Sequence, residues 1–357
     1  MNQFKEHQNF EFSEESLRKK FRLSEFLSEK IITGVAFLSI AIIVLIFVFV
    51  FRETLPVFKS QKVKQVQTES VQAQEQYGVT ETDTLMTDNI LGSTDSVAGG
   101  KDVATLKSLA GKEWLPVSDN PRYGLMPLFV GTLKITLIAM LFAAPIAILA
   151  ALFSASFAPY WLRELIKPAI ELLAGFPSVV IGFFALMVMA SFFQSVFGYD
   201  GRLNAFVGGV AMALAAIPII FTITEDALTA VPASYTEASL ALGATKWQTA
   251  LFVVLPAATP GIFAAILLGI GRVFGETMIA LMATGNAAMI SANPFESVRT
   301  LAATIGAEMA EVVFGDTHYS VLFLIGSLLF VFNFSLNALA EFYVKGKLVK
   351  RFQGKTA

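Results

Sequence analysis

The sequence predicts an all-α integral membrane protein with six transmembrane helices. Only 15% of its 357 residues are charged, whereas 55% are hydrophobic and 12% aromatic. A soluble domain has about 25% charged residues, so this chain lacks the charge needed to cover a water-facing surface. In addition, apolar runs of bilayer length, which is about 20 residues, recur along the chain.

Composition also excludes several classes of protein. The net charge of −2 argues against a nucleic-acid-binding protein that works through a basic face. The chain has no cysteine and only two histidines. A disulfide scaffold and a thiolate- or imidazole-rich metal site are therefore excluded.

The six expected spans are long, apolar and nearly free of charge. They are Ile31–Phe51, Ile135–Leu162 with a helix end near Phe157, Leu172–Tyr199, Leu203–Thr224, a run from Pro256 to about Ala283, and Tyr319–Ala340. The first exceeds the apolar core of about 7–15 residues in a signal peptide, so we interpret it as a membrane anchor. Gly175-Phe176-Pro177 is expected to break the start of the third span.

Basic residues predict the orientation of these spans. They gather in the N-terminal segment 1–30, in the tail 345–357 and between spans two and three. The short loops on the other side carry only Arg202 and Arg299. The positive-inside rule therefore places both termini in the cytoplasm.

Residues 52–122 differ in composition from the rest of the chain, being rich in Gln, Thr and Ser with mixed charge. We predict a long external, periplasmic-side loop that is partly flexible. A small ordered piece is expected near Leu106–Leu115. A separate folded domain is less favoured, because apolar periodicity is weak there.

Residues 225–256, between spans four and five, are expected to form a cytoplasmic elbow. Pro232 is suited to open a helix and Gly243 to end it. A second helical run then leads into the membrane through Leu255-Pro256. We call residues 225–256 the elbow.

A motif in the elbow, EAS at 237–239 followed at fixed spacing by Gly243 and by LP at 255–256, resembles the EAA loop of ABC-importer permeases. Ser239 replaces the usual second Ala. The resemblance implies that this helix is the coupling helix, which docks into a groove of an ATPase subunit. It assigns coupling to four residues: Glu237, Ala238, Ser239 and Gly243. A plain amphipathic hairpin is the alternative.

The resemblance extends over residues 123–344, which it makes a type I ABC permease core. AIELLAGFPSVVIGFFAL at 169–186 and GRVFGETMIALMATGN at 271–286 are similar to stretches of the phosphate-specific permeases. EWLPVSDNPRYGLMPLFVGTL at 113–133 favours the PstC-type over the PstA-type branch of that family. The long loop and the first 25 residues have no counterpart in the resemblance.

The resemblance implies partners as well as a fold. They are a second permease of the PstA type, an ATPase dimer of the PstB type and a periplasmic phosphate-binding protein of the PstS type. ATP and Mg²⁺ would be bound by the ATPase, and no cofactor is expected in this chain. The expected location is the bacterial inner membrane.

Arg272 and Glu276 are the only charges expected well inside a span. A charge at mid-membrane costs at least about 2.5–3.5 kcal/mol, so it is expected to face a pathway or a partner. Their i,i+4 spacing would place both on one helix face. Arg272 could donate two parallel hydrogen bonds to an oxyanion, with Glu276 and the hydroxyl of Thr277 beside it. A purely structural ion pair is the alternative.

No catalytic motif is found, so the chain is not expected to be an enzyme. The GKT at 354–356 lacks the first glycine and the preceding strand of a P-loop. The sequence thus predicts the transmembrane subunit of an ATP-driven phosphate importer. A permease for sulfate or molybdate, and more remotely a membrane scaffold or receptor, remain alternatives.

Overall fold

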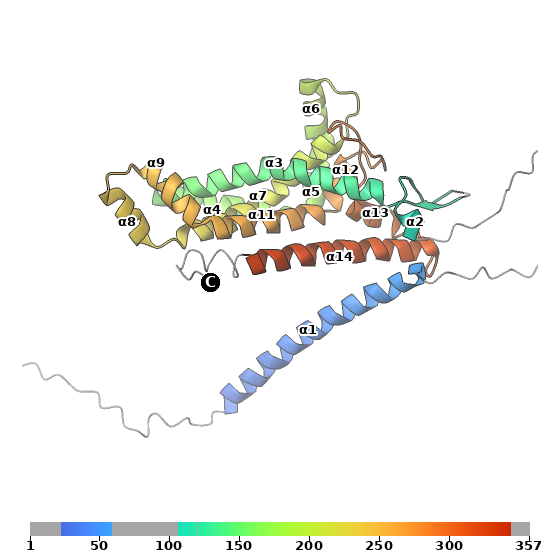
Figure 1. Cartoon of the computed structure of the whole chain (residues 1–357), viewed down its shortest axis with the longest axis horizontal. Helices are drawn as coiled ribbons and strands as arrows, with labels where there is room; N and C mark the ends of the chain where they lie inside the picture. The colour runs from blue at the N-terminus through green and yellow to red at the C-terminus, as the bar shows by residue number, and fades with distance from the viewer. Residues whose placement is uncertain (1–22, 59–105, 119, 344–357) are drawn as a thin grey trace, which may run out of the picture. The chain divides into compact units, whose positions relative to one another are not determined.

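The computed structural model describes residues 23–58, 106–118 and 120–343 (Figure 1). Most of the expected N-terminal segment, the expected C-terminal tail and residues 59–105 of the long loop lie outside this range. The chain divides into two compact units, residues 1–50 and 51–357. The described part of the first unit is the N-terminal portion of one long helix, α1 (Leu23–Phe58).

Among its described residues, the second unit consists mainly of helices and has one short antiparallel pair of strands, in which Trp114 faces Tyr123. Its elements are α2 (Leu106–Leu109), β1 (Trp114–Leu115), β2 (Arg122–Tyr123), α3 (Met126–Ser156), α4 (Tyr160–Gly175), α5 (Ser178–Phe184), η2 (Ala185–Met189), α6 (Ala190–Phe197), α7 (Ala205–Thr229), α8 (Ala233–Ala241), α9 (Lys246–Thr249), η3 (Ala250–Val254), α10 (Leu255–Ala257), α11 (Thr259–Phe274), α12 (Met278–Ala283), α13 (Leu301–Glu308) and α14 (Thr317–Tyr343).

Five described helical segments are long and apolar enough to cross a bilayer: Phe26–Val57, Met126–Ser156, Ser178–Phe197, Ala205–Thr229 and Thr317–Phe342. A sixth span results if the segments Lys246–Ala257 and Thr259–Phe274, which bend by 68° at Ala258, are taken together. Pro260 in the first turn of α11 has no N–H to continue the preceding helix, which accounts for the bend. The expected break at Pro177 is confirmed, because α4 ends at Gly175 and α5 begins at Ser178.

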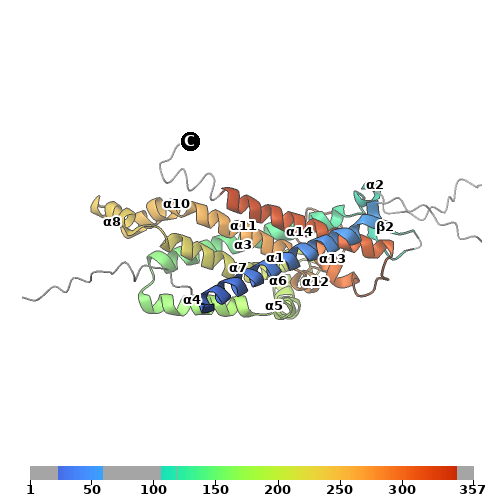
Figure 2. The same cartoon turned by 90° about the horizontal axis from the view of Figure 1, so that it is seen from below.

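Small residues bring the central helices of the second unit close together. Ala139, Ala143, Ala147 and Ala151 recur every fourth residue of α3 and are fully buried. α3 and α7 pack along their lengths, and α11 packs against α7 and α14, as Figure 2 also shows. A Cβ on Gly209 of α7 would lie 2.5 Å from a methyl carbon of the Ile138 side chain. Helices in lipid associate through such close approach of small residues.

The expected starts of the second span, at Ile135, and of the third span, at Leu172, were wrong. The second span begins at Met126 rather than Ile135, because α3 continues through Lys134, whose Nζ donates to the carbonyl oxygen of Ser291 at 3.1 Å. The stretch between spans two and three is a separate 16-residue helix, α4, in which no residue is fully buried.

Polar side chains join four segments at the end of the second unit opposite α8. Glu308 pairs with Arg299 at 2.9 Å and with His318 Nε2 at 2.9 Å, and accepts a hydrogen bond from Trp114 Nε1 at 3.1 Å. Burial raises the pKa of the Glu308 carboxyl, but the hydrogen bonds from His318 and Trp114 and the charge of Arg299 outweigh it. The net pKa is therefore below its ordinary value. This cluster holds the ordered piece around Trp114 against α13 and α14.

Glu308→Gln should lower the melting temperature at pH 7, by the equivalent of about 2 kcal/mol for lost hydrogen bonds to a charged group. Because the folded-state pKa is depressed, the ionised carboxylate stabilises the fold fully above the ordinary value of 4.5. This stabilisation is lost as the pH falls through the folded-state pKa. The difference in melting temperature between wild type and variant, followed by tryptophan fluorescence in detergent, should shrink below pH 4.5. Glu311→Gln, on an exposed residue nearby, is the control. A difference that is independent of pH would contradict the prediction.

Candidate coupling and translocation sites

The elbow folds as its sequence predicts. α8 starts directly after Pro232, and Gly243 ends it with a φ of +88°, a left-handed conformation that favours glycine. Thr245 then caps α9 in a capping box, in which its hydroxyl accepts from the Gln248 N–H and the Gln248 side chain accepts from the Thr245 N–H. α8 is therefore a short helix with defined ends. Figure 1 shows it at one end of the second unit, with α13 at the other.

The four residues assigned to coupling lie together on α8 and its end. Glu237, Ala238 and Gly243 are exposed. Ser239 is half-buried, and its hydroxyl forms a 2.9 Å hydrogen bond with that of Thr249 in α9. This bond ties the two arms of the elbow together, a role that an alanine at this position could not fill. Glu237 also lines a partly open cavity of about 490 Å³ between α8, α9, η3, α4 and the ends of α3 and α7.

Arg272 and Glu276 are brought together, but not on one continuous helix. α11 ends at Phe274, so the expectation that the fifth span runs unbroken to about Ala283 was wrong. Gly275, a poor helix former, follows the last helical residue, and α12 restarts only at Met278. Glu276 therefore lies in a break of the helix. Its carboxylate is 3.9 Å from the Arg272 guanidinium.

The two charges differ in environment. Glu276 is 8% exposed, whereas the Arg272 side chain is 49% exposed. At this distance and exposure the pair is weak, because solvent-exposed ion pairs contribute at most about 1 kcal/mol. A guanidinium in a bilayer-length segment that remains half-exposed must meet water or a partner protein. The geometry favours an accessible cation over a locking ion pair.

The residues around Glu276 pack closely against α13 and α14. Cβ atoms on Gly271 and Gly275 would lie 3.3 and 3.4 Å from the Asn333 amide of α14, so both glycines permit a close approach of α14. Thr277 places its methyl group against Gly306 of α13, and its hydroxyl makes a long, 3.5 Å contact with the Gly275 carbonyl oxygen. α11 rises about 1.5 Å per residue, so Arg272 is roughly 20 Å along the helix from the elbow.

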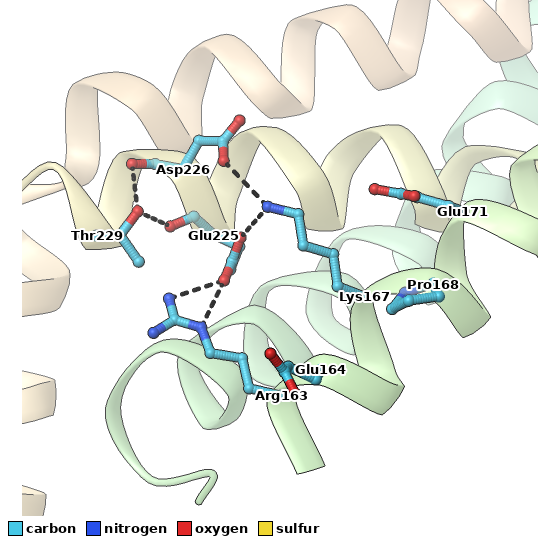
Figure 3. Close-up of a pocket in the computed structure, with 8 residues that line it drawn as sticks. All are labelled: Arg163, Glu164, Lys167, Pro168, Glu171, Glu225, Asp226 and Thr229. Carbon is cyan, nitrogen blue, oxygen red and sulfur yellow. Dashed lines mark hydrogen bonds and ion pairs between the residues drawn. The ribbon is translucent and has the colours of Figure 1, made fainter. Parts of the chain in front are cut away.

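A buried carboxylate near the elbow was missed by sequence analysis. The Glu225 side chain, in the second-last turn of α7, is 3% exposed and pairs with Arg163 at 2.9 Å and Lys167 at 3.2 Å (Figure 3). Glu225 follows the apolar part of the fourth span, so the sequence predicts it at the start of the cytoplasmic elbow. The i,i+4 spacing of Arg163 and Lys167 was the available signal, since it puts two cations on one helical face.

Bilayer-length helices closely packed in a bundle, with a protruding elbow at one end, are the architecture of a multi-pass transport permease. The chain belongs to the family described as "Binding-protein-dependent transport system inner membrane component", whose model matches residues 124–348. It is accordingly an inner-membrane protein. Members of this family are the permease components of ABC importers, which work with ATPase subunits and substrate-binding proteins.

Several curated relatives are similar over most of their length. "Probable ABC transporter permease protein YqgH" of Bacillus subtilis is 34% identical over 65% of this chain and 75% of its own. "Phosphate transport system permease protein PstC" of Mesorhizobium japonicum is 34% identical over 66% of this chain and 76% of its own. The protein of the same name from Pasteurella multocida is 32% identical over 69% and 81%.

Among solved structures, the inward-facing MetNI methionine ABC transporter matches 62% of this chain and 93% of the solved chain. Its TM-score is 0.46 at 20% identity.

Proposed function

We propose that this chain is the PstC-type transmembrane subunit of an ATP-driven phosphate importer. The observation that carries the proposal is its similarity, at 31–34% identity, to several phosphate transport permeases. The half-exposed Arg272 in the break after α11 supports it, because a planar guanidinium can donate two parallel hydrogen bonds to an oxyanion.

In the proposed assembly a PstA-like permease completes the pathway and a PstS-like protein delivers phosphate from the periplasm. Two PstB-like subunits bind ATP and Mg²⁺ and hydrolyse the ATP, so this chain has no nucleotide site of its own. The helix α8 transmits ATPase closure to the bundle through Glu237, Ala238, Ser239 and Gly243. A short helix with defined ends suits this task, because it moves as a rigid body.

At the other end of α11, Arg272 receives the anion transiently. Glu276, 3.9 Å away, competes with the anion for the guanidinium and so favours release. Thr277 adds a hydroxyl beside the break. Both termini lie in the cytoplasm in this proposal, which places the elbow on the same side as the ATPase.

Competition for uptake tests the substrate assignment. In cells whose only phosphate importer contains this chain, uptake of labelled phosphate should be blocked by excess unlabelled phosphate and unaffected by an equal excess of sulfate or molybdate. Cells that lack the chain are the control for background uptake. Inhibition by sulfate or molybdate would assign the permease to that oxyanion, and uptake equal to the background would refute a transport role.

A further inference from the structure

The helix α4 contacts the rest of the second unit along one stripe only. The half-buried residues of α4 recur at helical spacing: Leu162, Arg163, Ile166, Lys167, Ile170 and Leu173. Ile166 and Ile170 pack against the core formed by α3 and α7. All other residues of α4 are exposed. Apolar contact along so narrow a stripe constrains the position of α4 on α7 less than directional hydrogen bonds do, so the polar contacts at the same stripe contribute to its placement.

Most of those polar contacts meet at one carboxylate, that of Glu225; Lys167 Nζ also lies 3.8 Å from Asp226 Oδ1. Glu225 Oε1 accepts hydrogen bonds from Arg163 Nε at 3.1 Å and Nη2 at 2.9 Å, and its Oε2 accepts one from Lys167 Nζ at 3.2 Å. The three side chains point toward one another between α4 and α7 (Figure 3). We call Glu225, Arg163 and Lys167 the clamp. Because it uses both oxygens and two donors one turn apart, it fixes the position and rotation of α4 on α7.

Net stability does not explain the burial of Glu225. Removing a carboxylate from water costs about as much as its ion pairs return, so a buried pair is weak evidence for stability. The directional hydrogen bonds of Glu225 nevertheless define the position of α4 on α7 more narrowly than apolar contacts would. The clamp is therefore better explained by the placement of α4 that it imposes.

The clamp joins the first residue of the elbow, Glu225, to α4, the helix that leads into the third span. The Thr229 hydroxyl, one turn after Glu225, donates to the Glu225 carbonyl oxygen at 3.0 Å, and α8 begins four residues later. Arg163 and Thr229 also line the cavity that Glu237 lines. At its other end α4 runs through the break at Pro177 into α5. A displacement of the elbow thus reaches α5 through α4 only if α4 is held to α7.

We propose that Glu225 is a positioning residue: through Arg163 and Lys167 it makes α4 move with α7 and the elbow as one body, so that elbow motion is passed to the third span. The inference rests on the proposed function for the source of that motion, an ATPase bound at α8. The placement of α4 by the clamp itself does not depend on which substrate is carried.

Two measurements on the assembled transporter in lipid test this. The first is the ratio of anion uptake to ATP hydrolysis in proteoliposomes. The second is a distance between spin labels on cysteines introduced at Leu172 of α4 and Ala230 at the end of α7, both exposed. The chain has no cysteine of its own, so within it these labels are unique. In the wild-type background one narrow distance is expected, unchanged by a non-hydrolysable ATP analogue.

Glu225→Gln, which removes the buried charge itself, is measured beside Arg163→Gln combined with Lys167→Gln, a double variant that removes both cations but leaves the Glu225 carboxylate buried without them. In both we expect the label distance to broaden and uptake per ATP to fall at least about 5-fold, the lower range of typical coupling. Lys167→Arg keeps a donor and should retain both properties. Glu171→Gln, on an exposed residue of the same helix, is the matched control and should match wild type.

Unchanged label distances and unchanged uptake per ATP in the double variant would overturn the inference. Broadened distances with normal uptake per ATP would also overturn it, because α4 would then be placed by the clamp without transmitting motion. Failure of the proposed function looks different: uptake would be insensitive to Glu237→Lys, while the label distance without nucleotide would still report on the clamp.

Discussion

Glu237→Lys is expected to abolish ATP-driven uptake while leaving the chain in the membrane and assembled. Glu237 is exposed on α8, so its replacement should not disturb the bundle. A reversed charge at a docking surface turns attraction into repulsion, at a cost of several kcal/mol. Uptake of labelled phosphate should therefore fall by about 100-fold or more. ATPase activity that no longer responds to phosphate-loaded binding protein should accompany the loss.

Glu171→Lys is the matched control, because it makes the same charge reversal at an exposed position of α4, outside the elbow. It should retain most of the uptake. If the Glu237→Lys variant takes up phosphate as fast as the wild type, the coupling assignment is refuted. The elbow is then better described by the alternative, a plain amphipathic hairpin.

Arg272→Gln should lower phosphate uptake at least about 10-fold, since a charge-assisted bidentate contact contributes roughly 1.5–3 kcal/mol. The melting temperature should hardly change, because the 3.9 Å pair with Glu276 involves a half-exposed guanidinium. Arg272→Lys should restore uptake only in part, as an ammonium group cannot form the same planar pair of bonds. Uptake assays and thermal unfolding of the same preparations give both readouts.

Arg122→Gln serves as the control, because Arg122 forms an exposed ion pair with Glu113 far from the break in sequence. Its uptake should match wild type. If Arg272→Gln instead lowers the melting temperature and leaves uptake per folded transporter unchanged, the ion pair is structural and the pathway assignment is wrong.

Local signals predicted the elbow well. As predicted, Pro232 opens α8, Gly243 ends it with a positive φ, and a second helical arm follows; the cap of that arm at Thr245 was found only in the structure. Each of these signals acts within a few residues of the chain, through missing N–H donors, permitted backbone conformations and side-chain caps. The break at Pro177 was predictable for the same reason.

The fifth span could not be predicted in the same way. The apolar run from Pro256 to Ala283 suggests one helix, yet the structure bends it at Ala258 and ends α11 at Phe274. Hydropathy measures how favourably a side chain is transferred from water into an apolar environment. It carries no information about the residue at which a helix ends. The stop at Gly275 is a position where α14, through Asn333, approaches the backbone closely.

The clamp could not be predicted from the order of residues along the chain. Glu225 is about 60 residues from Arg163 and Lys167, and each residue alone fits a solvated boundary of a span. Only the packing of α4 on α7 brings the three together and removes the carboxylate from water, leaving its side chain 3% exposed. The i,i+4 spacing of Arg163 and Lys167 indicates that the two cations share one helical face, but only tertiary geometry decides that Glu225 pairs with them.

The sequence by itself determined the membrane class, the approximate spans, the elbow and its resemblance to ABC permeases, because hydropathy and helix-end signals are properties of short stretches of chain. The tertiary structure alone decided that Arg272 is half-exposed beside a helix break, that Ser239 bonds Thr249, and that Glu225 is buried between two cations. Exposure and pairing depend on which helices pack together, so they emerge only once the bundle has formed.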